Sequence, residues 1–307
     1  MATKIEYLDG KRLYGTIGLG IKNLIAHQQT LDEINVFPVP DGDTGTNMVF
    51  TLMPIISDCR DNIPERADET MSLLANTALD SARGNSGTII AQFFYGLSKS
   101  FHGLETITVK DFAEGFNQGY LSAYDSLIKP AEGTIITVMR DVANAAKKIA
   151  DEGCDDYVYF VKNIFKEAEL SLKTTKTILK ILKKSDVVDS GALGFVLLIQ
   201  GVLNVIERGR GGRIQTTHLD ISYELDKIES LNKDIDFKIE NKFCTECVVK
   251  GKNINRNELK LKIKDFGDSM VMAGSAQHVK VHIHTNEPAK FFTVCEQFGN
   301  VHDRKAD

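Results

Sequence analysis

Three observations predict a mainly α protein in which a long helical domain is followed by a smaller α+β domain. Apolar residues recur at three- and four-residue steps from Asp9 to about Arg208, enough for roughly eight helices of ordinary length. The polar run GRGGR then begins at Gly209, and beyond it the hydrophobic period changes to two. We therefore expect a helical domain over residues 1–208, a linker over 209–216 and an α+β domain over 217–307.

Apolar faces define the helices of the first domain. The stretches from Phe112 to Leu127, Ile135 to Ile149 and Tyr157 to Leu172 repeat apolar residues at helical spacing, so each has one face suited to a core. The stretch from Ala192 to Ile206 is apolar on nearly every face. We expect it to be a buried helix of the protein core. It does not suit a membrane span, because polar residues interrupt it and it is too short to cross a bilayer comfortably.

Short alternating runs define the second domain. They have the length of ordinary strands, and two helical segments accompany them. The expected strands cover Phe243–Val249, Ser269–Ala273, His278–His284 and Asn300–Lys305, and the expected helices cover Asn257–Lys264 and Pro288–Phe298. This order indicates a small sheet covered by helices.

Composition excludes several classes of protein. The chain has 307 residues, 42% hydrophobic and 26% charged, which allows a substantial core and is unlike a disordered chain, a collagen or a small disulfide-rich toxin. A formal net charge of -5 gives no positive field to attract nucleic acid or anionic lipid. Five scattered cysteines, and an N-terminus without the apolar segment of a signal peptide, favour a cytoplasmic protein with reduced thiols.

The segment NVFPVPDGDTGTNM is the most informative loop. It places Asp41 and Asp43 two residues apart between two expected helices, where their carboxylates can converge on a hard cation. Magnesium prefers oxygen ligands and leaves room for phosphate oxygens in its shell. Thr44, Thr46 and Asn47 add donors at the start of a helix, where phosphates bind well. An Asp-Gly turn that caps the next helix is the alternative.

Three further polar loops, each with a glycine, also lead into expected helices. They are centred on Gly84–Gly87, on Glu132–Thr134 and on Asp189–Gly191. Each alone is explained by an ordinary N-cap, with Ser86 as the capping residue in the first. Four such loops in one helical domain would bring several helix N-termini to one end of a bundle and form a site for nucleotide phosphates and metal. The chain contains no Walker P-loop motif.

The motifs PDGDTGTNM, ARGNSG, EGTIITVMRD and DSGALGF, in this order, resemble the ATP-binding domain shared by the L subunit of dihydroxyacetone kinase and the catalytic subunit of bacterial fatty acid kinase. The second is the closer match, because CTE, GDSM and VKVHIHTNEP are similar to the middle domain of fatty acid kinase. The resemblance implies an antiparallel eight-helix barrel that holds ATP and two magnesium ions at one end.

The resemblance also implies the site residues. Asp41 and Asp43 match the acidic loop that acts in catalysis through magnesium, and Asn35 is the nearest candidate for a third ligand, an aspartate in dihydroxyacetone kinases. Met139 falls where the family packs an apolar side chain near the adenine. Lys176 stands where related kinases have a basic contact, although a solvated helix lysine is its ordinary explanation. The expected nucleotide contacts are Thr44, Gly45, Thr46, Asn47, Gly84, Asn85, Ser86, Gly133, Met139, Lys176, Asp189, Ser190 and Gly191.

A second metal site is expected in the α+β domain. His282 and His284 point to the same face of a strand and suit zinc, and the fatty acid kinase resemblance implies Cys244 as the third ligand. The odd spacing places Cys247 on the opposite face, as a buried thiol or, if the strand is bulged, as an extra ligand. His278 is a possible substitute for one histidine. Two surface histidines and an unrelated cysteine are the alternative.

The resemblance implies a kinase that uses ATP to phosphorylate the carboxylate of a fatty acid presented by a lipid-binding carrier protein. Because a carboxylate is ionised near neutral pH, we expect no general base. The alternatives are a non-catalytic ATP-binding scaffold and a dihydroxyacetone-kinase-like L subunit. We further expect a homodimer. Fatty acid kinase subunits continue into a C-terminal domain that engages the carrier, and this sequence is expected to stop before it.

Overall fold

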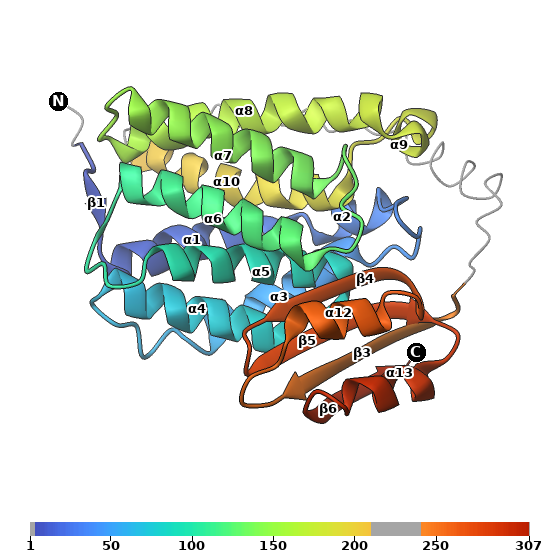
Figure 1. Cartoon of the computed structure of the whole chain (residues 1–307). Coiled ribbons are helices and arrows are strands. Elements are labelled where there is room, and N and C mark those ends of the chain that lie inside the picture. The colour runs from blue at the N-terminus through green and yellow to red at the C-terminus, as the bar shows by residue number, and fades with distance from the viewer. Residues whose placement is uncertain (1–3, 210–240, 307) are drawn as a thin grey trace.

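The computed structural model describes residues 4–209 and 241–306 (Figure 1). Its first part is an antiparallel barrel of eight long helices, as the family resemblance implies, with two short helices of six residues between them. The long helices are α1 (Gly10–Ala26), α3 (Thr44–Ser57), α4 (Ala67–Ser81), α5 (Gly84–Ser100), α6 (Val109–Ser126), α7 (Ile135–Asp151), α8 (Tyr157–Ile178) and α10 (Ser190–Gly209), and the short ones are α2 (Gln28–Glu33) and α9 (Lys180–Ser185). Two-residue strands β1 (Tyr7–Leu8) and β2 (Ile107–Thr108) pair beside them.

The last helix closes the barrel against the first. The α1 and α10 backbones approach so closely that a Cβ atom on Gly20 would lie 2.5 Å from the carbonyl oxygen of Leu198. In the same way, a Cβ atom on Gly201 of α10 would overlap the carbonyl oxygen of Leu19 on α1. The predicted buried helix from Ala192 to Ile206 is thus confirmed as the central part of α10.

Aromatic side chains fill much of the barrel interior. Phe93 lies edge-on to Phe116 and to Phe195, with ring centroids 5.6 and 5.1 Å apart. These rings come from α5, α6 and α10, so one cluster joins three helices. Such pairs add about 0.5–1.5 kcal/mol each to the stabilisation from burial.

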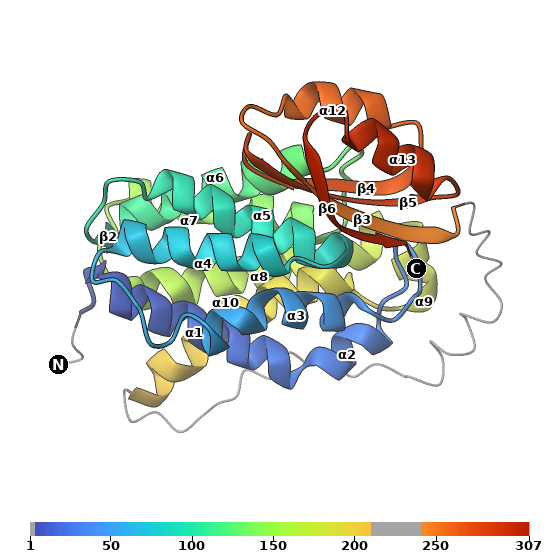
Figure 2. The same ribbon diagram turned by 90° about the horizontal axis from the view of Figure 1, so that it is seen from below.

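The second part is a four-stranded antiparallel sheet in the order β4-β5-β3-β6. Two helices cover its outer face, and its inner face rests on the helical domain (Figure 2). The elements are β3 (Phe243–Lys250), α12 (Arg256–Ile263), β4 (Gly267–Gly274), β5 (His278–Thr285), α13 (Pro288–Cys295) and β6 (Asn300–Ala306). Each expected strand and helix is present, with ends that coincide or differ by at most three residues. The predicted linker, except Gly209, and residues 217–240 lie outside the described part of the chain.

Polar contacts attach the small domain to the barrel. The Lys260 ammonium donates to the carbonyl oxygens of Asp125 and Leu127, at 3.1 and 2.7 Å. The amide of Gly274 donates to Gln92 on α5 at 3.0 Å. These bonds hold the inner face of the sheet over one end of α5 and α6 and thereby over the loops that the sequence singles out.

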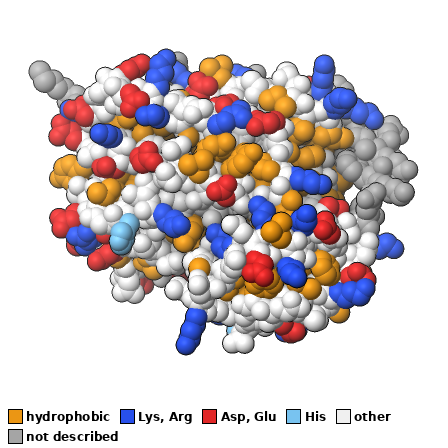
Figure 3. All heavy atoms as spheres, viewed as in Figure 1, with side chains coloured by type: hydrophobic (Ala, Val, Ile, Leu, Met, Phe, Trp, Pro, Cys, Tyr) orange, Lys and Arg blue, Asp and Glu red, His pale blue; other side chains and the backbone are white. Residues whose placement is uncertain are grey.

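The surface is mixed in charge. Acidic and basic side chains are interspersed over the face shown in Figure 3. Among the helices that the structure describes, none is long and apolar enough to cross a membrane.

Candidate functional site

Four helix N-termini meet where the small domain covers the end of the barrel. The starts of α3, α5, α7 and α10 contribute to two adjoining cavities, here named the polar cavity and the apolar cavity. Residues lining the polar cavity include Asn35, Asp41, Asp43, Thr44, Asn47, Gly84, Asn85, Ser86, Cys244, His282 and His284. Residues lining the apolar cavity include Phe37, Thr44, Asn85, Ser86, Ile89, Leu127, Lys129, Thr134, Ile135, Asp189, Gly191, Asp268, Ser269 and Met270.

The acidic loop presents a concentrated negative charge to the polar cavity. Asn35 is buried and its Nδ2 donates to Asp41 Oδ1 at 2.7 Å. Burial, reinforced by the carboxylate of Asp43, raises the pKa of Asp41 to about 6. The Oδ1 atom of Asn35 is buried with no hydrogen-bond partner among the described residues. Two crowded carboxylates and an unpaired amide oxygen are a donor set that fits magnesium.

Some residues at the start of α3 line the cavities, and others hold the helix in place. Thr44 lines both cavities and Asn47 lines the polar one. Thr46 instead receives support from Asp32, whose carboxylate accepts from the Thr46 amide at 2.9 Å and from its hydroxyl at 2.8 Å. Gly45 packs against α2, where a Cβ atom would overlap a backbone oxygen. Gly45 and Thr46 therefore position the helix, and neither is among the residues lining the cavities.

The glycine loop at the start of α5 faces Asn47. Gly84 has φ of +55°, and a Cβ atom there would overlap the Asn47 side chain. Asn85 and Ser86 line both cavities, and Asn85 Oδ1 is buried without a hydrogen-bond partner in the part of the chain described. Ser86 donates to the Thr44 carbonyl oxygen at 3.3 Å and lies inside the helix, so it is not the N-cap.

We expect Gly84→Ala to lower the free energy of unfolding by about 2–4 kcal/mol, because it adds an overlap with Asn47 to the cost of a positive φ. Gly103→Ala is the matched control, since Gly103 has φ of +84° and a Cβ atom at that position would have nothing within 4 Å. It should cost about 1 kcal/mol. Urea unfolding monitored by circular dichroism measures both; equal losses would show that the contact with Asn47 is unimportant.

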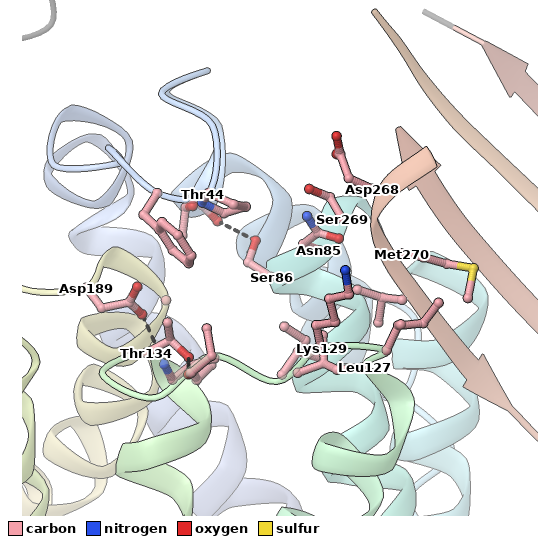
Figure 4. A pocket seen from close by; sticks show the side chains of 18 of the residues that line it. Thr44, Asn85, Ser86, Leu127, Lys129, Thr134, Asp189, Asp268, Ser269 and Met270 are labelled. Carbon is pink, nitrogen blue, oxygen red and sulfur yellow. Dashed lines mark hydrogen bonds between the residues drawn. The ribbon is translucent and has the colours of Figure 1, made fainter. Parts of the chain in front are cut away.

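Asp189 joins the N-termini of α7 and α10. Its buried carboxylate accepts from the amide of Ile135 at 3.0 Å (Figure 4). It also accepts from the amide of Ala192 at 2.8 Å. Burial raises the pKa of Asp189 to about 6, although both amide bonds favour the ionised form. Gly191 lines the apolar cavity beside it, while the Ser190 hydroxyl donates to Leu31 and is buried.

Besides Gly45, Thr46 and Ser190, three further residues expected to contact nucleotide lie outside the lining of both cavities. Met139 is fully buried in the barrel core. Lys176 pairs with Asp186 at 3.2 Å on the surface. Gly133, just before α7, packs on the side chain of Ile178. The next residue, Thr134, lines the apolar cavity instead.

The sheet brings the second expected metal set into the polar cavity. Cys244 pairs with His284 across β3 and β5, and the ligand atoms of Cys244, His282 and His284 lie within 4.8 Å of one another. His282 Nε2 is buried with no hydrogen-bond partner among the residues described. Burial opposes ionisation of the Cys244 thiol, but hydrogen bonds with both histidines prevail and lower its pKa to about 7. One thiolate and two imidazoles fit zinc.

The other two candidate ligands point elsewhere. Cys247 is buried on the opposite face of β3, in the core beneath α12 and α13, where Cys295 is its neighbour. His278 lies at the far end of β5, with Nδ1 3.8 Å from Asp80. The interpretation of Cys247 as a buried thiol is confirmed, and neither residue belongs to the cluster.

Sequence reasoning missed Glu246. It is buried and accepts hydrogen bonds from the Gly84 amide and from His282 Nδ1, both at 2.9 Å. Burial would raise its pKa, but His282 and Lys280 prevail and lower it to about 2. Its place two residues after Cys244, on the same strand face, is the signal that would have identified it.

Both domains of the chain match known protein families. The family profile of the DAK2 domain matches residues 38–204, and that of the FakA-like fatty acid kinase middle domain matches residues 240–307. Uncharacterized proteins of Staphylococcus saprophyticus and Staphylococcus epidermidis are 37% and 34% identical over 97% of this chain and 54% of their own length. The chain thus spans about half the length of these curated relatives.

The helical domain also has a structural relative. The dihydroxyacetone kinase from C. freundii, solved in complex with AMP-PNP and Mg²⁺, aligns with a TM-score of 0.50 and 16% identity over 66% of this chain and 35% of that chain. At this identity the alignment shows a shared fold.

Proposed function

Because the chain belongs to the DAK2 domain family and continues into a FakA-like fatty acid kinase middle domain, we propose that it is an ATP- and magnesium-dependent kinase component. Its substrate would be the carboxylate of a fatty acid presented by a lipid-binding carrier protein, and its product an acyl phosphate. The observation that carries the proposal is that the acidic loop, the glycine loop and the middle-domain cluster all line one polar cavity.

The polar cavity suits phosphoryl transfer because that reaction requires mainly positioning and charge neutralisation. Asp41 and Asp43, with Asn35, would hold two magnesium ions that neutralise phosphate charge. The start of α5 at Gly84, followed by Asn85, directs a helix N-terminus toward the same cavity, where phosphates bind favourably. A fatty acid carboxylate is already ionised near neutral pH, so its attack needs no general base.

The apolar cavity suits the nucleoside. Phe37, Ile89, Leu127 and Ile135 offer apolar surface beside the phosphate-facing residues Thr44, Asn85 and Ser86, which line both cavities. The second domain contributes Met270 and the neighbouring β4 residues to the opposite wall (Figure 4). Cys244, His282 and His284 would bind zinc near the phosphates. We also propose that the chain forms a homodimer and receives its fatty acid from the carrier protein.

A hydroxylamine trap distinguishes the acyl phosphate from other products. ATP, magnesium and the protein are incubated with a fatty-acid-loaded carrier, or with dihydroxyacetone in a parallel reaction, and the quenched mixture is analysed for acyl hydroxamate and phosphate ester. We expect hydroxamate in the first reaction, absent with Asp41→Asn. A phosphate ester from dihydroxyacetone alone would favour the dihydroxyacetone-kinase alternative, and ATP binding without either product would favour a scaffold.

Magnesium affinity should depend on pH through Asp41. Since burial and Asp43 raise the pKa of Asp41 to about 6, its carboxylate takes up a proton below that pH and must release it to bind metal. We expect the apparent affinity for magnesium to be nearly constant above about pH 7 and to fall about tenfold per pH unit well below pH 6. Calorimetric magnesium titrations between pH 5 and 8 measure this; constant affinity over the range would exclude Asp41 as a ligand.

A further inference from the structure

Glu246 lies between the middle-domain cluster and the glycine loop. It stands on the inner face of β3, opposite His282 on β5 and two residues from Cys244. One carboxylate oxygen, Oε1, accepts from His282 Nδ1 and from the Gly84 amide, each at 2.9 Å. A single buried atom thus joins the two domains at their functional residues.

On the metal side, Glu246 fixes the histidine. A carboxylate can only accept, so the short contact places the hydrogen of His282 on Nδ1. Cys244 Sγ is 3.9 Å from the same nitrogen, a much weaker contact. This leaves Nε2, which is buried and has no partner among the described residues, as the ring nitrogen available to bind a metal. Carboxylates that accept from a ligating histidine orient it and strengthen its binding to metal.

On the other side, Glu246 holds the first amide of α5. Gly84 is confined between this carboxylate and the Asn47 side chain. Lys280 adds a second link, since its ammonium donates to the Ala82 carbonyl oxygen and lies 3.5 Å from Glu246 Oε2. The next residue along the helix, Asn85, lines both cavities, so a shift of Gly84 moves a wall of the proposed phosphate site.

We propose that Glu246 is a positioning residue that couples metal binding at Cys244, His282 and His284 to ATP binding at the glycine loop. A metal bound to His282 would hold the imidazole ring in one orientation. The ring would then hold the Glu246 carboxylate in place, and that carboxylate would fix the position of the Gly84 amide. This inference rests on the proposed function, since it requires that ATP phosphates bind beside Asn85. Because coupling is reciprocal, zinc should tighten ATP binding and ATP should tighten zinc binding by the same factor.

The test compares zinc-loaded and zinc-stripped protein, each titrated with ATP in saturating magnesium. We expect zinc to tighten ATP binding about tenfold in the wild type, the scale of one charge-assisted hydrogen bond. In Glu246→Gln, whose neutral amide keeps the shape and loses the charge, the ratio should fall close to one. Glu296→Gln, which alters an exposed carboxylate paired with Arg304 in the same domain, should keep the wild-type ratio.

Cobalt supplies a readout that is independent of turnover. At saturating Co²⁺, Glu246→Gln should retain the thiolate-to-metal absorption of Cys244, showing that the ligands remain while the coupling is lost. Loss of that absorption would overturn the proposal, because Glu246 would then be required for the metal site itself. Persistence of the tenfold ratio in Glu246→Gln, or ATP binding indifferent to zinc in the wild type, would also overturn it. Absence of ATP binding in every form would overturn the proposed function as well.

Discussion

Asp41→Ala and Asp43→Ala should each reduce magnesium-dependent turnover of ATP by about a thousandfold or more while the helical fold is retained. Both side chains line the polar cavity, and neither supports the barrel core. Removing either carboxylate would weaken the binding of the magnesium ions that neutralise phosphate charge, and phosphoryl transfer depends on that neutralisation. Initial rates of ATP consumption with the fatty-acid-loaded carrier measure the loss, and far-ultraviolet circular dichroism monitors the fold.

Asp61→Ala is the matched control for the acidic pair. Asp61 is an exposed aspartate in the turn after α3 and lines neither cavity. Its replacement should leave turnover within twofold of the wild type, as is usual for surface changes away from a site. Activity above about a tenth of the wild-type rate in Asp41→Ala or Asp43→Ala would contradict the magnesium assignment.

The second large effect is expected at the middle-domain cluster. Cys244→Ser and His282→Ala should each weaken zinc binding by about a hundredfold or more, because a tetrahedral site loses one of its three protein ligands. Metal analysis after dialysis against a weak chelator measures retained zinc. His278→Ala is the control, since this histidine lies on the same strand beside Asp80, outside the cluster. Zinc loss in His278→Ala equal to that in His282→Ala would contradict the ligand assignment.

Local pattern was sufficient to predict about eight long helices, the strands and helices of the second domain, and the order of the loops, although it did not predict the short elements α2, α9, β1 and β2. The odd spacing of Cys244 and Cys247 assigns them to opposite strand faces, and the register with β5 confirms that only Cys244 meets the histidines. Likewise, glycines and short polar side chains before apolar helices indicated where α3, α5 and α10 begin. These features depend on a few neighbouring residues, which is why sequence alone discloses them.

Features that depend on tertiary packing were not predictable in this way. Met139 lies four residues beyond Ile135, which lines the apolar cavity, yet Met139 itself is fully buried in the core. Asp32 supports Thr46 from a separate helix, and no local motif marks it. Glu246 meets Gly84 from 162 residues away, so their contact depends on how the two domains dock. That docking also places both proposed metal sites on one cavity.

Calorimetric titration of ATP with and without magnesium, on the wild type and Asp41→Ala in parallel, tests the central claim most directly. We predict binding to the wild type that depends on magnesium and is lost or reduced at least about a hundredfold in Asp41→Ala. Binding of equal strength in the variant, or no binding in the wild type, would contradict the assignment of the polar cavity as an ATP and magnesium site.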